Sequence, residues 1–252
     1  MSHRLRYLYR VYRYRYRVDP AEIRYMCERL RRGEMAVDVG SFKGAYAYWM
    51  RRCVGTEGSV VAFEPQPKQA AYLRGVVAMM KWQNVAIEAQ GVSNVRGELQ
   101  LFQPPSGHEA TFVARKAEEQ SCETITVPVT TLDAYFAARS TQPDFIKIDV
   151  EGHELEVLQG ARETLAASRP MLLVECEARH RADGDVRPVF ELLASLGYEG
   201  SFFLGGKRRP LAEFDPQQHQ RIEPGGKLPP GYANNFAFEH PAKQRPRAVG
   251  SR

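Results

Sequence analysis

The chain has 252 residues but only four cysteines, at positions 27, 53, 122 and 176, and no C-x-x-C pair. This spacing excludes a disulfide framework and a cysteine-rich zinc site, so we expect reduced thiols. Long apolar runs are also missing, because none approaches the roughly 20 residues that a membrane-spanning helix needs. Arginine and tyrosine interrupt the basic N-terminus where a signal peptide would have an apolar segment. These absences predict a cytoplasmic protein.

Positive charge is scarce outside the two ends of the chain. The net charge is +5, but residues 1–18 hold six arginines and residues 241–252 hold four basic residues, both without an acid. Removing both segments leaves −5 for the rest of the chain. This balance does not favour a nucleic acid as substrate, since such proteins usually present a basic face. We therefore expect three parts: a basic Arg/Tyr arm (1–18), one domain (19–240) and a basic, disordered tail (241–252).

Strand-like and helix-like segments alternate along the domain. Seven strands are expected, at residues 35–39, 59–63, 85–90, 145–150, 171–175, 198–204 and 235–238. The main helices between them are expected at residues 43–54, 67–80, 154–167 and 186–196. A β-rich insertion (98–102 and 124–129) separates the third strand from the fourth, and residues 205–234 read as a long loop rich in glycine and proline. The alternation predicts a mostly parallel α/β sheet that binds ligands at the carboxyl ends of its strands.

A glycine turn follows the first expected strand, in the sequence Asp38-Val39-Gly40-Ser41-Phe42-Lys43-Gly44. Such a turn lets a ligand approach the bare backbone and the N–H groups that begin the next helix. Glu64 ends the second strand, twenty residues after Gly44. A carboxylate there can accept hydrogen bonds from both hydroxyls of a ribose. The turn and the acid together predict a site for an adenosine-containing cofactor.

The turn lacks the middle glycine of the dinucleotide fingerprint G-x-G-x-x-G, which lets the backbone press against a pyrophosphate. Its pattern D-x-G-x-x-x-G suits S-adenosylmethionine better than NAD, with Asp38 near the ammonium group of the ligand. A nicotinamide-dependent oxidoreductase is the alternative enzyme. A non-catalytic cofactor-binding protein of the same fold is the other alternative.

Ionisable residues gather after the fourth and fifth expected strands. Asp149, Glu151 and His153 follow the fourth strand, and Glu175 ends the fifth. Such groups are costly at a crevice unless they react or pair. We expect His153 to act as a general base, because its ordinary pKa is near neutrality, although it could equally cap the following helix. Asp149 is expected to orient substrate or cofactor.

Two neighbouring charged residues have more limited expected roles. Glu175 is expected to bind a second hydroxyl of the substrate, and Lys147 to be a structural ion-pair partner. A carboxylate pair formed by Glu175 and Asp149, without further ligands, does not predict a metal site.

Five motifs resemble the FkbM-type S-adenosylmethionine-dependent methyltransferases: DVGSFKG (38–44), FEP (63–65), GVSN (91–94), KIDVEGHELEVLQGA (147–161) and LLVECE (172–177). The resemblance implies a Rossmann-like class I methyltransferase sheet that is mostly parallel and seven-stranded, with an antiparallel last strand and a small β insertion. It also implies O-methylation of a hydroxyl on a small molecule such as a sugar or polyketide. Cofactor contacts are implied at Asp38, Gly40, Ser41, Gly44, Glu64, Pro65, Val92, Ser93 and Asp149.

The resemblance has two limits along the chain. The family often has Ala and Asn at the positions of Ser41 and Phe42, so a contact to the cofactor can differ there. The Arg/Tyr arm lies outside the resemblance. Arginine with interleaved tyrosine can bind phosphates and bases, lie on anionic lipid headgroups, pack on the second subunit of a homodimer or fold back as a lid.

Overall fold

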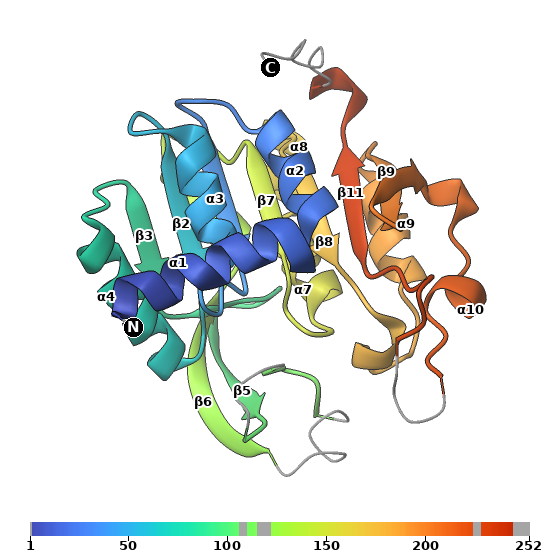
Figure 1. The fold of residues 1–252 in the computed structure, drawn as a ribbon. Helices are drawn as coiled ribbons and strands as arrows, with labels where there is room; N and C mark the ends of the chain where they lie inside the picture. The colour runs from blue at the N-terminus through green and yellow to red at the C-terminus, as the bar shows by residue number, and fades with distance from the viewer. Residues whose placement is uncertain (1, 106–109, 115–121, 224–227, 244–252) are drawn as a thin grey trace.

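The computed structural model describes residues 2–105, 110–114, 122–223 and 228–243. Its centre is an eight-stranded sheet in the order β10-β9-β11-β8-β7-β1-β2-β3 (Figure 1). The strands are β1 (Met35–Val39), β2 (Ser59–Phe63), β3 (Val85–Glu88), β7 (Phe145–Ile148), β8 (Met171–Glu175), β9 (Glu199–Leu204), β10 (Lys207–Pro210) and β11 (Asn235–Glu239). Five neighbouring strands, from β3 to β8, run parallel, and β11 is antiparallel to both β8 and β9. The predicted class I methyltransferase sheet is therefore confirmed.

The expectation of seven strands is wrong by one edge strand, β10. Gly205 and Gly206 both have positive φ angles, of 57° and 74°, and reverse the chain so that β10 pairs with β9. Positive φ costs glycine little, which explains the tight reversal. The four residues of β10 are Lys-Arg-Arg-Pro, all exposed, so no apolar alternation marks them as a strand. The rest of the expected loop holds the short helices η3 (Leu211–Glu213) and α10 (Pro216–His219).

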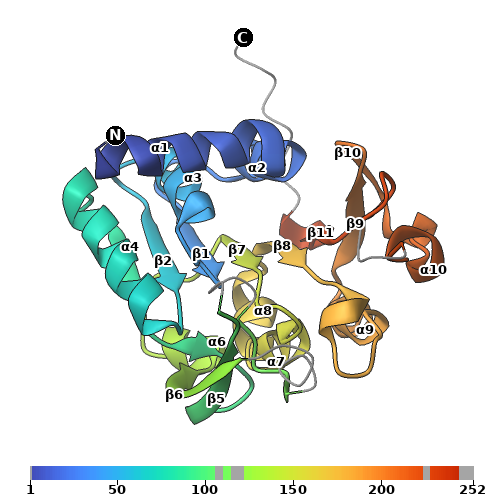
Figure 2. The ribbon, with the colours of Figure 1, turned by 60° about the horizontal axis from the view of Figure 1, so that its bottom comes forward.

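The predicted β insertion forms a separate three-stranded sheet. It consists of β4 (Gly91–Val92), β6 (Glu123–Thr130) and β5 (Gly97–Gln103), in that order. β5 and β6 pair antiparallel, with Leu101 and Val127 buried beneath them. Figure 2 shows this small sheet beside the strand ends at which the candidate site lies.

Helices cover both faces of the central sheet (Figure 2). One layer contains α2 (Pro20–Arg29), α3 (Ala45–Val54) and α4 (Pro67–Met80), which pack with Ala36, Phe145 and Leu173. The other contains α6 (Leu132–Phe136), α7 (Glu154–Gln159), α8 (Arg162–Ser168) and α9 (Arg187–Ser195), which pack with Val37, Ile146 and Leu172. Successive strand residues thus point to opposite layers, as the period of two requires.

One expected helix, over residues 154–167, is divided into α7 and α8. A Cβ built on Gly160 would lie 2.1 Å from the carbonyl oxygen of Ser93, so this glycine permits a close backbone approach at the break. Asp133 then accepts hydrogen bonds from the backbone N–H groups of Glu163 and Thr164 and satisfies the first turn of α8.

The Arg/Tyr arm is helical. It forms α1 (His3–Arg13), which lies across α3 and α4 of the same chain, and a π-helical segment, η1 (Tyr14–Val18), which packs against α2 (Figure 1). Tyr7 and Val11, four residues apart, are buried. Trp49 donates its indole N–H to the carbonyl of Val11 at 2.9 Å. No helix in the described part of the chain has both the length and the apolarity needed to cross a membrane.

Two short 3-10 helices complete the described elements: η2 (Ala178–His180) and η4 (Pro241–Lys243). Lys243 bonds the carboxylate of Asp144 at 3.1 Å and the carbonyl of Ser168 at 2.9 Å. The first three residues of the expected tail are therefore attached to the domain. Residues 244–252 of that tail lie outside the described residues.

Candidate active site

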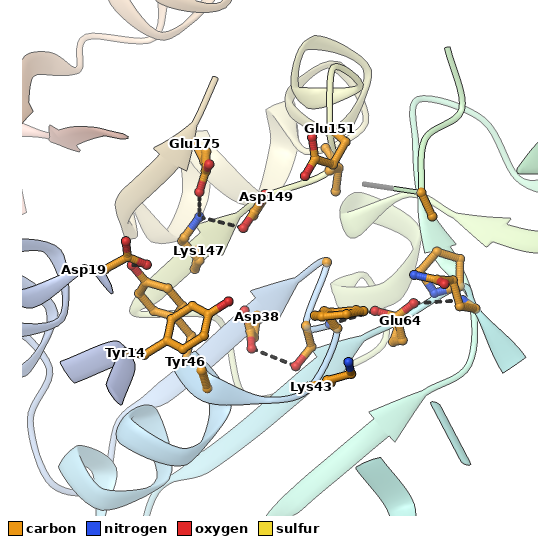
Figure 3. Close-up of a pocket in the computed structure, with 18 of the residues that line it drawn as sticks. Tyr14, Asp19, Asp38, Lys43, Tyr46, Glu64, Lys147, Asp149, Glu151 and Glu175 are labelled. Atoms are coloured by element: carbon orange, nitrogen blue, oxygen red, sulfur yellow. Dashed lines mark hydrogen bonds and ion pairs between the residues drawn. The ribbon is translucent and has the colours of Figure 1, made fainter. Parts of the chain in front are cut away.

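A cavity of about 460 Å³ lies at the carboxyl ends of β1, β2, β7 and β8 (Figure 3). Its lining is rich in charge. Six carboxylates line it: Asp19, Asp38, Glu64, Asp149, Glu151 and Glu175. Three cations join them: Arg10, Lys43 and Lys147. The cavity thus brings together the two groups of residues that the sequence singled out, and its acidic balance suits a ligand with positive charge.

Asp38 and Ser41 hold the glycine turn in shape. The Asp38 carboxylate accepts hydrogen bonds from the Ser41 hydroxyl at 2.8 Å and from the backbone N–H of Ala47 at 3.1 Å. The second bond satisfies a free N–H group in the first turn of α3. Burial raises the pKa of Asp38 to about 6, although these hydrogen bonds act in the opposite direction. Both residues, which the sequence predicts to contact the cofactor, line the cavity.

The two glycines of the turn have different roles. Gly40 has a φ of +83° and lines the cavity, packed directly against the end of β7. Gly44 has a φ of +72° and lies behind the lining, where a Cβ would be 2.7 Å from the Leu73 side chain. The Gly44 carbonyl accepts a hydrogen bond from the Tyr7 hydroxyl at 3.0 Å. Gly44 therefore joins the turn to the arm instead of lining the cavity.

Glu64 is fixed at the end of β2 by backbone donors. Its carboxylate accepts hydrogen bonds from the N–H of Phe42 at 2.7 Å and from the N–H of Gln66 at 2.9 Å. Burial raises the pKa of Glu64 to about 7, and the two N–H donors oppose that rise. A carboxylate has about four acceptor positions, so two bonds leave capacity for ligand hydroxyls. Pro65 lines the cavity beside it.

Phe42 adopts a strained backbone conformation, with a φ of +45°. This conformation directs its N–H toward Glu64 and carries the next residue, Lys43, to the cavity wall. Residues other than glycine seldom adopt positive φ, and such strain is concentrated at functional sites.

Lys147 forms an ion-pair triad with Asp149 and Glu175 (Figure 3). Its buried Nζ lies 3.6 Å from the Asp149 carboxylate and 3.8 Å from that of Glu175. Burial lowers the pKa of Lys147, but the two carboxylates outweigh it and the net shift is upward. Burial also raises the pKa of both Asp149 and Glu175, and mutual repulsion adds to the rise for Glu175. The structure thus places Lys147 as the expected ion-pair partner.

His153 does not line the cavity. Its Nε2 lies 2.9 Å from the Ser93 hydroxyl, and its ring packs 5.0 Å from the ring of Phe112. Burial lowers the pKa of His153 and so favours the neutral ring, although Glu156 acts in the opposite direction. The residue occupies the N-cap position of α7, but its side chain makes no capping hydrogen bond. The ring therefore supports the cavity from behind, together with Ser93.

Val92 and Ser93 share this supporting position. Neither lines the cavity, and both are buried, Val92 within β4 and Ser93 directly after it. Asp38, Gly40, Ser41, Glu64, Pro65 and Asp149 are the predicted cofactor residues that do line it. Gly44, Val92 and Ser93, the other predicted cofactor residues, do not line it.

The part of the cavity near Asp19 and Glu175 contains residues that the sequence did not single out for the site. Tyr14 comes from η1, and the Tyr46 hydroxyl donates to the carboxylate of Asp19 at 3.0 Å. The Asn234 amide donates to Glu175 at 2.8 Å from the loop that precedes β11. Tyr14 follows Tyr7 by two helical turns, so the helical period carried a signal for it. Asn234 reaches β8 only through tertiary packing.

A mostly parallel sheet with an antiparallel β11 beside β8, and a cavity at its carboxyl edge, defines a class I methyltransferase fold. Residues 38–199 match the model of the methyltransferase FkbM domain, and the chain belongs to that family. The resemblance found in its motifs is thereby confirmed.

Two known proteins are similar to this chain. The hexuronic acid methyltransferase AglP of Haloferax volcanii is 27% identical over 164 residues, which cover 62% of this chain and 61% of that relative. This chain therefore matches about three fifths of the length of its curated relative. The crystal structure of a methyltransferase FkbM from Methylobacillus flagellatus KT has a TM-score of 0.52 and 17% identity, over 86% of this chain and 50% of that one. At that identity, the second likeness concerns the fold alone.

Proposed function

We propose that this protein transfers the methyl group of S-adenosylmethionine to a hydroxyl of a small molecule such as a sugar or polyketide. The observation that supports this most directly is the division of one cavity between Glu64 on one side and the triad of Lys147, Asp149 and Glu175 on the other (Figure 3). The first group suits a nucleoside, and the second suits a hydroxyl that must lose a proton.

The donor side fits S-adenosylmethionine group by group. Glu64 would accept hydrogen bonds from the ribose hydroxyls, and the apolar lining from Leu101, Ala110 and Phe112 would cover the adenine. Asp38 and the turn at Gly40 would hold the methionine end. When bound, the donor supplies a methyl group activated on a positively charged sulfur, which the acidic lining favours electrostatically.

The acceptor side provides a proton acceptor. A hydroxyl is a weak nucleophile, so methyl transfer to its oxygen is helped by a base within hydrogen-bond reach of its proton. His153 lies behind the cavity wall, and we assign this role to Asp149, whose carboxylate faces the cavity. Its raised pKa makes it a stronger base than an ordinary aspartate. Glu175, oriented by Asn234, would bind a second hydroxyl of the acceptor.

A binding and transfer experiment tests this function. Calorimetric titration with S-adenosylmethionine, S-adenosylhomocysteine and NAD is expected to show binding of the first two alone. Transfer of labelled methyl to a panel of sugars is then measured, with hexuronic acids first because the relative in Haloferax volcanii is named for them. Binding of NAD alone would support the oxidoreductase instead. Donor binding without transfer to any sugar or polyketide would favour the non-catalytic protein.

A further inference from the structure

Arg10 reaches the cavity from α1, outside the residues that match the family model. Its guanidinium donates to the Tyr72 hydroxyl on α4 at 2.9 Å and lies 5.8 Å from the centre of that ring. Two further contacts fix α1 itself, the Tyr7–Gly44 and Trp49–Val11 hydrogen bonds. The arm therefore presents Arg10 at a defined position in the cavity wall.

Lys43 lines the same cavity from the glycine turn. Its Nζ lies 4.5 Å from the centre of the Phe42 ring. Burial lowers the pKa of Lys43, and the positive charge of Arg10 lowers it further. Within the described parts of the chain, neither Arg10 nor Lys43 forms an ion pair with an acid. Two cations that repel each other across a cavity wall are stabilised by an anion between them.

The position of Arg10 and Lys43 indicates which anion they would bind. Lys43 belongs to the same turn as Ser41, whose hydroxyl bonds Asp38, and it lies at the opposite end of the close-up from Glu175 (Figure 3). Lys147, the third cation, is already paired with two carboxylates. An anion at Arg10 and Lys43 would thus lie near Asp38, which is placed to attract an ammonium group. An amino acid presents those two charges, a carboxylate and an ammonium, on one carbon.

We propose that Arg10 and Lys43 together bind the carboxylate at the methionine end of the methyl donor. This proposal rests on the proposed function. It makes α1 a component of the donor site, although the family match begins only at residue 38. The arm then acts as a fixed wall over the glycine turn, because its contacts with Gly44 and Trp49 hold Arg10 in place.

Decarboxylated S-adenosylmethionine tests this assignment, because it lacks only the carboxylate. The wild-type protein is expected to bind S-adenosylmethionine about 10- to 100-fold more tightly than the decarboxylated compound, as charge-assisted hydrogen bonds predict. Arg10→Gln combined with Lys43→Gln is expected to remove that difference. The affinity for the decarboxylated compound should stay the same or rise slightly, since the variant removes two charges that repel a cationic ligand. Arg13→Gln, on the exposed face of the same helix, is the matched control.

The outcomes separate this proposal from the proposed function. If the wild-type protein binds neither adenosyl compound, the proposed function itself is wrong. If it binds both and the double variant keeps the full preference for the carboxylate, the proposal for Arg10 and Lys43 is wrong. A variant that keeps that preference but has a higher KM for an acidic acceptor would assign the two cations to the acceptor and overturn the proposal in the same way. Equal loss of affinity for both compounds would indicate a structural role.

A separate observation concerns the outer face of the same arm. Leu5, Tyr9, Tyr12 and Tyr16 are spaced by four, three and four residues, and their exposed fractions are 56%, 67%, 42% and 67%. This spacing places them along one line of a helix. Exposed arginines at positions 4, 6, 13 and 17 flank the line, and residues 1–18 contain no acid. We call this surface the Tyr/Arg face.

We infer that the Tyr/Arg face lies on an anionic lipid surface. Tyrosine is enriched at the level of lipid headgroups, and arginine is attracted by the negative surface potential. Helix α1 lies on the outside of the domain in both ribbon views, so a broad surface can approach it (Figures 1 and 2). Arg10 contacts Tyr72 and lines the cavity, and the inference uses the exposed arginines at other positions, so it does not depend on the donor site.

Vesicle sedimentation tests the inference with the full chain. Binding to phosphatidylcholine vesicles that contain phosphatidylglycerol is expected, with little binding to phosphatidylcholine alone. Arg4→Gln with Arg6→Gln should weaken it about 30-fold, whereas Arg162→Gln with Arg169→Gln on the opposite side of the sheet should not. Equal binding to both vesicles, or binding to neither, would overturn the inference. Binding of the Tyr/Arg face to single-stranded DNA or to a second copy of the chain, instead of to lipid, would also overturn the inference.

Discussion

Gly40 and Asp149 approach each other so closely that a Cβ built on Gly40 would lie 1.8 Å from the carbonyl oxygen of Asp149. This contact joins the glycine turn after β1 to the end of β7, and hence the proposed donor side of the cavity to the proposed acceptor side. The backbone of Gly40 and the carbonyl group of Asp149 are both held by their strands, so the fold sets the distance between the turn and Asp149.

Gly40→Ala is therefore expected to be severely destabilising, by about 3 kcal/mol or more, since the added methyl group overlaps backbone and φ is +83°. Chemical denaturation measures this loss in the free energy of unfolding. Gly75→Ala is the control, because Gly75 lies in α4 with open space around it, and there alanine should stabilise by about 0.5–1 kcal/mol. A tolerated Gly40→Ala would contradict the close approach.

Lys147→Met is expected to lower the free energy of unfolding by about 2–4 kcal/mol, because it leaves Asp149 and Glu175 without their shared cation. Burial raises the pKa of both carboxyls, so they take up protons more readily than ordinary carboxyls as the pH falls, which relieves their repulsion. The loss should therefore be smaller near pH 5 than near pH 8. Lys68→Met, at an exposed position, should change stability by less than about 0.5 kcal/mol. A pH-independent loss would argue against the triad.

The affinity for S-adenosylhomocysteine is expected to rise with pH through about 7, the pKa of Glu64. The ionised carboxylate accepts the ribose hydrogen bonds, and below the pKa each pH unit should cost up to about tenfold in affinity. Calorimetric titrations at several pH values on both sides of 7 measure how the affinity depends on pH. Glu64→Gln should bind more weakly above pH 7 and lose the slope. If that variant kept the same pH dependence, another group would be responsible.

Asp149→Asn is expected to lower kcat by about 10²- to 10⁴-fold while the affinity for the donor changes little, as for the loss of a general base. His153→Ala should instead lower stability, because it removes the ring that contacts Ser93 and Phe112 behind the cavity. Turnover and thermal unfolding of both variants distinguish the two positions. A large loss of turnover in a fully stable His153→Ala protein would restore the catalytic role that the sequence predicted for His153.

The sequence predicted the strands well where burial on both faces makes them apolar. β1, β2, β7 and β8 are apolar because helices cover both faces of the sheet, and their bounds lie within two residues of the expected ones. The sequence did not predict β10, because an exposed edge strand needs no apolar residues. Arginine and tyrosine alternate along the arm, but its buried residues, Tyr7 and Val11, follow the helical period.

The sequence by itself determined the family, the α/β class and the main residues on the Glu64 side of the cavity, because Asp38, Gly40 and Glu64 follow strands whose carboxyl ends must meet at one edge. Only the tertiary structure decided which side chains face the cavity. His153 follows the same strand as Asp149, yet the turn at Gly152 directs it toward Ser93. Arg10 and Asn234, far from the motifs in sequence, reach the cavity through packing that no local pattern encodes.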